Sequence, residues 1–127
     1  MTIQDFERFK ASLPDWAILD GCFAGKIRPT DVDGLVERRG VCLFLEHKGG
    51  HGEVGKGQDI TFTSLARQGN TCVVYWTDDE EKKNVVRILV YHGNDKKLIE
   101  SPCLSKLREC AKHWFSMANT QHNRTNS

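Results

Sequence analysis

Long hydrophobic runs are missing from this chain. No stretch approaches the roughly 20 apolar residues that a membrane-spanning helix needs, and the first residues do not read as a signal peptide. Charge of one dominant sign is missing too, because 18 Lys and Arg side chains nearly balance 17 Asp and Glu side chains. Bulk electrostatics therefore neither demands nor forbids a nucleic-acid partner. We expect a cytoplasmic protein without a membrane segment.

Closely spaced cysteine pairs are also absent. The five cysteines are odd in number, and no Cys-x-x-Cys occurs. Cys42 and Cys72 fall in predicted buried strands, which favours free thiols in a reducing compartment over disulfides. A zinc site would have to combine such a thiol with His47 or His51, and the spacing matches no zinc motif. The glycine-rich stretch 49–57 lacks the Gly-Lys-Ser/Thr of a phosphate-binding P-loop.

What the chain does contain is a pair of β-like runs joined by a short turn. The runs are residues 31–37 and 41–48, and Arg39-Gly40 suits a two-residue hairpin loop. Both faces of the second run begin apolar, which predicts a strand covered on both sides by helices. Charge enters only at the end of that run, where Glu46 and Lys48 share one face.

The length of the hairpin loop decides which acid faces Glu46. With a two-residue loop, Arg38 pairs with Val41. Counting outward then places Asp33 opposite Glu46. Opposed side chains have Cβ atoms roughly 4.5–5.5 Å apart, which is near enough for two carboxylates to share one divalent cation. A four-residue loop would place Asp31 there instead. We prefer Asp33, and a purely structural network of salt bridges is the alternative to a metal site.

An ordered set of motifs follows from this hairpin. It consists of Asp33, the tripeptide Glu46-His47-Lys48, Gly49-Gly50, Gln58 at the start of a predicted helix (59–68), and Gly69 before the apolar strand 71–76. The set resembles the PD-(D/E)XK nuclease superfamily, and within it the VRR-NUC or resolvase-like branch of small, stand-alone, phage-type nucleases. Two features depart from the family pattern: the literal Pro-Asp pair is absent, and Phe62 stands where RecB-like relatives have Tyr.

The resemblance implies a restriction-endonuclease-like core in the order α-β-β-β-α-β and a DNA endonuclease that depends on Mg²⁺ or Mn²⁺. Asp33, Glu46 and the backbone carbonyl of His47 would bind the metal ion. Lys48 would position or activate the attacking water and offset developing negative charge. Gln58 would hold that water or a phosphate oxygen at the start of its helix.

Further groups complete the predicted site. The family often adds an acid from the first helix, where Asp5 and Glu7 are the candidates, although Thr2 makes Asp5 a capping residue as well. Four cations are predicted to contact phosphates: Lys26, Arg28, Lys56 and Arg67. The partner would be duplex or branched DNA, and cleavage of both strands would suggest a homodimer. The stretch 49–57 is either a flap over the substrate or a plain connector.

The remaining segments are predicted as scaffold. Helices are expected over residues 3–13 and from Ser101-Pro102 onward, and strands over residues 16–23 and 85–91. Residues 1–118 would form a single α/β domain with a mixed central sheet flanked by helices, followed by a polar, disordered tail of residues 119–127. The competing function is a catalytically silent nucleic-acid-binding or protein-interaction domain with the same fold.

Overall fold

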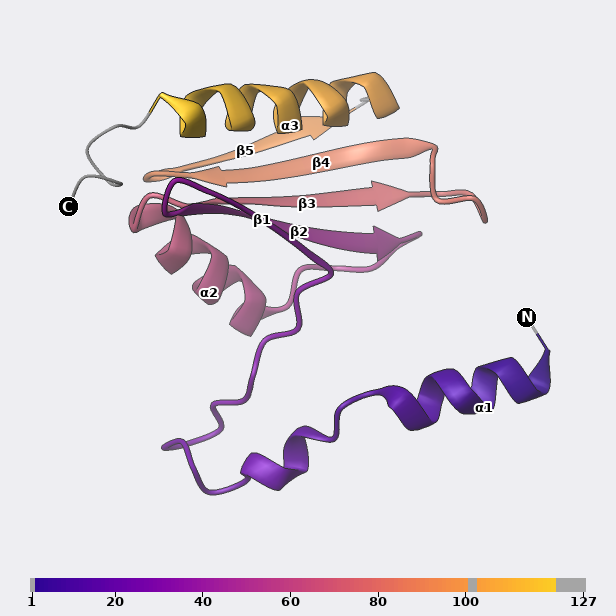
Figure 1. Cartoon of the computed structure of the whole chain (residues 1–127). Coiled ribbons are helices and arrows are strands. Elements are labelled where there is room, and N and C mark those ends of the chain that lie inside the picture. The colour runs from indigo at the N-terminus through magenta and orange to yellow at the C-terminus, as the bar shows by residue number, and fades with distance from the viewer. Residues whose placement is uncertain (1, 101–102, 121–127) are drawn as a thin grey trace. The chain divides into compact units, whose positions relative to one another are not determined.

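A computed structural model describes residues 2–100 and 103–120 of the chain. They fall into two compact units, residues 1–30 and 31–127. In the first unit, helix α1 spans Ile3–Ser12 and the short 3-10 helix η1 spans Trp16–Leu19 (Figure 1). The capping box predicted at the start of α1 is confirmed. The Asp5 N–H donates to Thr2 Oγ1 at 3.1 Å, and the Thr2 hydroxyl donates to Asp5 Oδ2 at 2.8 Å.

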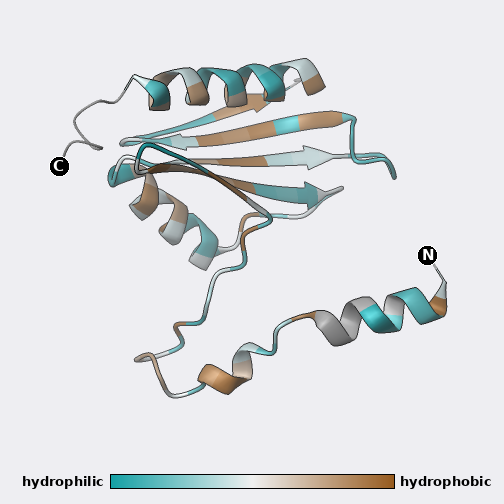
Figure 2. Cartoon of the chain, viewed as in Figure 1, coloured by the Kyte–Doolittle hydropathy of each residue, from teal (hydrophilic) through white to brown (hydrophobic). Residues whose placement is uncertain are grey.

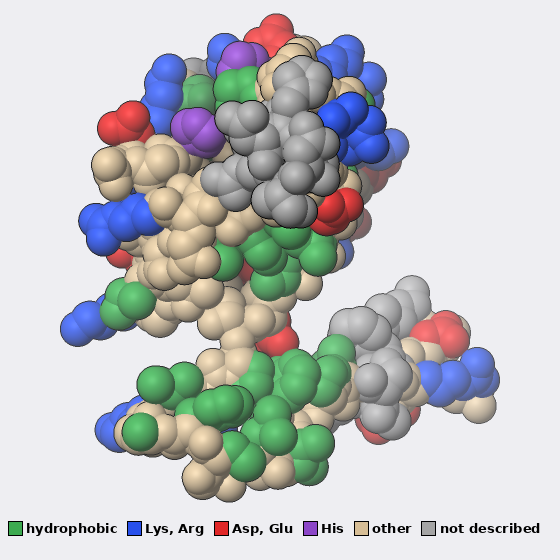
Figure 3. Space-filling model, turned by 60° about the vertical axis from the view of Figure 1, so that its left-hand side comes forward, with side chains coloured by type: hydrophobic (Ala, Val, Ile, Leu, Met, Phe, Trp, Pro, Cys, Tyr) green, Lys and Arg blue, Asp and Glu red, His purple; other side chains and the backbone are tan. Residues whose placement is uncertain are grey.

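The strand predicted over residues 16–23 is wrong. Asp15 caps η1 by accepting a hydrogen bond from the Ala17 N–H at 3.0 Å, which closes a helical turn where a strand was expected. Figure 3 shows hydrophobic side chains grouped on the surface of this unit. Among its described side chains, the exposed large apolar residues are Ile3, Leu13, Ile18, Phe23 and Ile27.

The second unit is an α/β structure with a five-stranded mixed sheet (Figure 1). In spatial order its strands are β1 (Gly34–Arg38), β2 (Val41–Gly49), β3 (Thr71–Thr77), β4 (Val85–His92) and β5 (Asp95–Glu100). β2 pairs with β3 in parallel through the crossover helix α2 (Lys56–Arg67), and the other neighbouring pairs are antiparallel. Helix α3 spans Leu104–Asn119. The predicted strands β2, β3 and β4 are confirmed, whereas β5 was not predicted.

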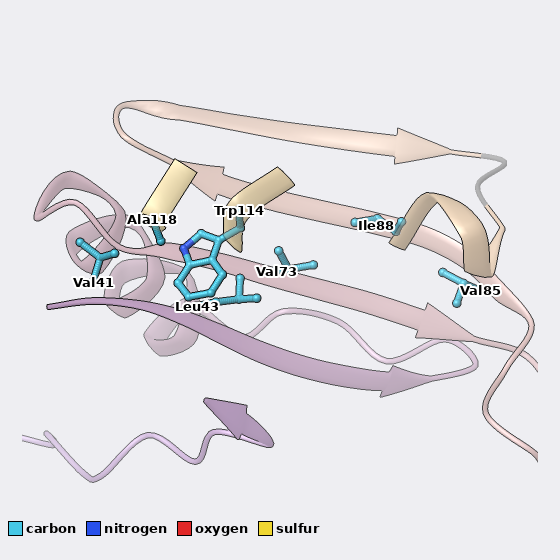
Figure 4. Packing of buried hydrophobic residues seen from close by; sticks show 7 residues of the cluster. All are labelled: Val41, Leu43, Val73, Val85, Ile88, Trp114 and Ala118. Atoms are coloured by element: carbon cyan, nitrogen blue, oxygen red, sulfur yellow. The ribbon is translucent and has the colours of Figure 1, made fainter. Parts of the chain in front are cut away.

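Helices cover both faces of the sheet, as the pattern of β2 predicted. On the α3 face, Val41 and Leu43 pack with Trp114 (Figure 4). On the α2 face, Phe44 packs against the cluster that contains Phe62. Burial of each such side chain stabilises the fold by roughly 1.5–3 kcal/mol. Figure 2 shows that β2 is hydrophobic over its first half and hydrophilic at its end, so its charged residues emerge from between these two cores.

The β1–β2 hairpin has the predicted two-residue loop. Arg38 pairs with Val41, so the alternative four-residue loop is wrong. Both loop residues have positive φ, 53° at Arg39 and 84° at Gly40, as a type I′ turn requires. The first strand is shorter at its start than predicted, because β1 begins only at Gly34. The start predicted for the last helix, at residues 101 and 102, lies outside the described residues. Of the predicted tail 119–127, Asn119 is the last residue of α3 and Thr120 is its C-cap, and residues 121–127 lie outside the described residues.

Candidate active site

The charged end of β2 lies at the carboxyl ends of the parallel pair β2–β3. Glu46 is in register with Val74, and Lys48 is in register with Trp76. Helix α2 begins at this end of the sheet, because the chain leaves β2 there and returns along the helix to the start of β3. Open α/β sheets bind their ligands outside the carboxyl ends of parallel strands.

Asp33 reaches this end of the sheet from the segment that precedes β1. Its Oδ2 accepts a hydrogen bond from the His47 N–H at 2.8 Å. The ladder has the predicted register and ends at Gly34 opposite Leu45, one residue after Asp33, whose negative charge acts on Glu46. Asp31 lies two residues further from the ladder than Asp33, which directly precedes its first residue, Gly34.

Glu46 is buried, with 8% of its surface exposed. Burial raises the pKa of its carboxyl, and the negative charge of Asp33 raises that pKa further, while Lys48 and Gln58 act in the opposite direction. Glu46 Oε1 lies 3.9 Å from Lys48 Nζ. Glu46 Oε2 has no hydrogen-bond partner among the described residues. The Lys48 ammonium therefore compensates this buried carboxylate only in part.

Lys48 connects the end of β2 to the start of α2. Its ammonium donates a hydrogen bond to Gln58 Oε1 at 2.9 Å. Gln58 lies in the first turn of α2, whose N-cap residue Gly55 provides no side-chain cap. The first backbone N–H groups of a helix have no partners within the helix and favour an anion at that end. The structure thus brings together Asp33, Glu46, Lys48 and Gln58.

The two predicted phosphate contacts in α2 lie at opposite ends of the helix. Lys56 is its first residue, two positions before Gln58, whereas Arg67 is its last. At 1.5 Å per residue, Arg67 lies about 14 Å from Gln58 along the helix axis. Of these two cations, Lys56 therefore lies at the same end of α2 as Gln58, and Arg67 lies at the other end.

The remaining predicted residues belong to the N-terminal unit. Asp5 is engaged in the capping box, and hydrogen bonds from Thr2 lower the pKa of its carboxyl. Arg28 Nη2 lies 4.0 Å from Asp20 Oδ1 on the surface of that unit. Glu7 and Lys26 also lie there, in α1 and in the segment after η1.

A loop that follows Lys48 is fixed by contacts that the sequence did not reveal. The Trp76 indole N–H donates to the Gly52 carbonyl at 2.6 Å. The Gly50 N–H donates to the Thr77 carbonyl at 3.0 Å. In the sequence, Trp76 is only an apolar residue of a predicted strand. Nothing in the sequence indicated that its indole N–H would bind the loop.

Helix α2 is fixed to the sheet by an acid that was also missed. Asp59 Oδ1 accepts hydrogen bonds from the Tyr91 hydroxyl at 2.7 Å and from the Lys96 ammonium at 2.6 Å. These bonds lower the pKa of Asp59, while burial is the main cause of a raised pKa at Tyr91. They tie the residue directly after Gln58 to β4 and β5.

The cluster combines the buried Glu46 carboxyl with the exposed Asp33 and the half-buried Lys48 and Gln58. Among the described residues, a hollow of about 720 Å³ opens at the same end of the sheet and is lined by His47, Thr77 and Arg87 among others, but not by the four clustered side chains. A nucleic-acid backbone is bound through phosphates that project from its outer surface, so such a substrate does not require a deep pocket.

No protein-family model, curated protein or solved structure matches this chain. Within the described ranges, no helix is long and apolar enough to cross a membrane. The function is therefore inferred from the side chains themselves.

Proposed function

We propose that this chain is a metal-dependent endonuclease that hydrolyses DNA phosphodiester bonds, with a core like that of restriction endonucleases. The observation that carries the proposal is the buried Glu46 carboxylate between Asp33 and Lys48, with one oxygen left unpartnered by the described residues. Buried charges persist in folded proteins when they are paired or bind a metal ion. The surroundings of Glu46 fit a carboxylate that binds a metal ion.

The donor set suits Mg²⁺ or Mn²⁺. Asp33 and Glu46 would hold the ion through carboxylate oxygens, together with the backbone carbonyl of His47. The described residues contain no group of three or more His, Cys, Asp or Glu side chains placed to hold a metal ion. Mg²⁺ does not need one, because it is commonly held by one or two carboxylates and keeps water and phosphate oxygens as its other ligands. When bound, the ion would polarise the phosphate and lower the pKa of a bound water.

Lys48 and Gln58 supply the polar groups for the reaction. The Lys48 ammonium offsets the negative charge that develops on the phosphate oxygens when water attacks. Its direction is set by the Gln58 side-chain oxygen, which accepts its hydrogen bond at 2.9 Å. The amide nitrogen of Gln58 has two N–H groups: a hydrogen bond from Gln58 lowers the pKa of the Glu46 carboxyl, and the second N–H would be a donor for a phosphate oxygen or the attacking water.

Cations outside the cluster would bind the DNA backbone. Lys56 lies at the start of α2, where Gly55 provides no side-chain cap for the N–H groups of the first turn. Arg67, at the other end of α2, would add a contact away from the reacting phosphate, and Lys26 and Arg28 of the N-terminal unit would add further contacts with the DNA backbone. Such contacts give affinity without base specificity, which fits a nuclease of duplex or branched DNA. A homodimer would place two such sites on the two strands of a duplex.

Cleavage of supercoiled plasmid tests the proposal. Wild-type protein should nick or linearise the plasmid with Mg²⁺ or Mn²⁺ but not with EDTA. Asp33→Asn, Glu46→Gln and Lys48→Ala should each lower the rate by a factor on the order of 10²–10³ while the circular dichroism spectrum is kept.

Asp31→Asn is the matched control and should retain activity. Loss of activity in this variant but not in Asp33→Asn would assign the metal to the other acid. If the pure wild-type protein cleaves no plasmid, branched or single-stranded DNA with either metal, the nuclease proposal is wrong. A catalytically silent binding domain then becomes the better description.

A further inference from the structure

We propose that Trp76 and Gly52 are positioning residues that hold the Lys48 side chain in the orientation that catalysis requires. This inference rests on the proposed function, because it concerns the lysine of that site. Neither residue carries a group that would act on a phosphate. Their role is to fix the path of the loop that packs against the lysine.

Trp76 anchors the loop from the buried side of the sheet. It is 3% exposed and sits in β3 directly beside Lys48 of β2. Its indole N–H donates to the Gly52 carbonyl at 2.6 Å, which is a short bond for this pair of atoms. A buried indole N–H is costly to leave without a partner, so this bond ties the loop to the core.

Gly52 brings the loop against the aliphatic stem of Lys48. A Cβ atom built on Gly52 would lie 3.5 Å from Lys48 Cβ and 3.6 Å from Lys48 Cδ. It would also lie 3.3 Å from the Gly49 carbonyl oxygen, which accepts a hydrogen bond from the Gly52 N–H at 3.0 Å. The backbone at Gly52 therefore occupies the space beside the lysine. An added Cβ would be in ordinary van der Waals contact with the Lys48 stem but too close to the Gly49 carbonyl oxygen, so the loop would have to shift.

The two ends of the Lys48 side chain are thus held separately. The loop packs on the stem, and Gln58 accepts a hydrogen bond from the ammonium. Asp59 in turn ties the same turn of α2 to Tyr91 and Lys96. A lysine has four rotatable bonds and several rotamers of similar energy, so an ammonium that must meet one phosphate oxygen gains from contacts along its whole length.

The first experiment compares Trp76→Phe with Trp114→Phe. Both residues are buried, but Trp114 lies on the α3 face of the sheet, away from the loop. Trp76→Phe keeps an aromatic ring in the core and removes the N–H that binds Gly52. We expect kcat for DNA cleavage to fall roughly 10- to 100-fold with KM unchanged, because the chemical step loses alignment and substrate binding does not. Trp114→Phe should lower the melting temperature and leave kcat unchanged.

The second experiment uses glycines of the same loop and does not disturb the core. Gly52→Ala should lower kcat in the same way, because its Cβ would lie 3.3 Å from the Gly49 carbonyl oxygen and the loop would shift along the Lys48 stem that it packs against. Gly55→Ala is the matched control, because a Cβ at Gly55 meets no atom within 4 Å and the backbone there is extended. It should leave kcat unchanged.

The results separate this inference from the function on which it rests. If the wild-type protein cleaves DNA while Trp76→Phe and Gly52→Ala match their controls in kcat, the positioning role is wrong and the nuclease stands. A rise in KM with unchanged kcat would also overturn it, because that pattern marks a binding residue. If the wild-type protein does not cleave DNA, both proposals are wrong.

Discussion

Removing the charge of Glu46 should separate two effects that this side chain has on stability. At 3.9 Å the Lys48 ammonium attracts the Glu46 carboxylate by about 4 kcal/mol at an effective dielectric constant of about 20. The pKa of Glu46 is nevertheless raised, so burial and the charge of Asp33 together outweigh that attraction. Above its pKa, the ionised Glu46 therefore destabilises the metal-free protein.

The pH dependence has a definite sign. Glu46 binds its proton more tightly in the folded than in the unfolded chain, where its pKa is close to 4.5. Its contribution to the free energy of unfolding therefore falls as the pH rises from about 4.5 through the raised pKa, and it stays low above that. In the absence of metal, Glu46→Gln should lose this decline and be more stable than the wild type at neutral pH.

A divalent ion should reverse the order. At a Mg²⁺ concentration ten times its dissociation constant, binding stabilises the folded state by about 1.4 kcal/mol. For a folded unit of this size, that corresponds to a rise in Tm of roughly 6–11 °C. The wild type should show this rise, and Glu46→Gln should not, because it has lost a metal ligand.

Thermal unfolding followed by circular dichroism, at pH 5 to 8 with EDTA or Mg²⁺, measures both effects. Glu109→Gln is the control, because that acid is exposed and pairs only weakly with Lys106 at 3.5 Å. The reasoning is refuted if Mg²⁺ stabilises Glu46→Gln as much as the wild type. It is equally refuted if no concentration of Mg²⁺ or Mn²⁺ raises the Tm of the wild type more than that of the Glu46→Gln variant.

Three further predictions concern binding and stability. Lys56→Ala should weaken DNA binding and reduce the magnitude of the slope of log K against log salt by about 0.9. Arg67→Ala should change both quantities less. Fluorescence anisotropy at several salt concentrations measures them. Arg39→Asn should raise the free energy of unfolding by about 0.5–1 kcal/mol, because Asn tolerates positive φ better than Arg. Gly40→Ala should lower that free energy by about 1–2 kcal/mol, because Ala does not favour positive φ. Urea titrations measure both changes. Ile88→Ala should cost about 2–5 kcal/mol in the same titrations, because Ile88 is fully buried.

Local sequence rules predicted the elements that build the site. Alternation of apolar residues along β2 placed Leu43 and Phe44 on opposite faces, and both lie against the expected helices. The two-residue loop then fixed the register that brings Asp33 to Glu46. These predictions succeeded because strand alternation and hairpin geometry depend on neighbouring residues alone.

The failures have physical causes of two kinds. A run of four apolar residues at Trp16–Leu19 fits a strand and a helical turn equally well, and the Asp15 cap favoured the turn. The strand β5 was not predicted, because most side chains of this edge strand are exposed and its sequence shows no clear apolar alternation. The bonds from Trp76 to Gly52 and from Tyr91 to Asp59 join residues far apart in sequence, so only the folded chain brings them together.

The turn between β4 and β5 offers a place to attach the protein without disturbing the site. His92 pairs with Asp95 across Gly93-Asn94, at the level of Thr71, where β3 begins. Trp76 lies five residues further along β3, which at 3.3 Å per residue is about 16 Å away, at the end of the sheet that holds Lys48. With the exposed Cys22 and Cys103 replaced by Ser, a cysteine introduced at Asn94 would tether the molecule to a bead or a fluorophore with the candidate site facing away from the support. Single DNA molecules could then be presented to it in a known orientation.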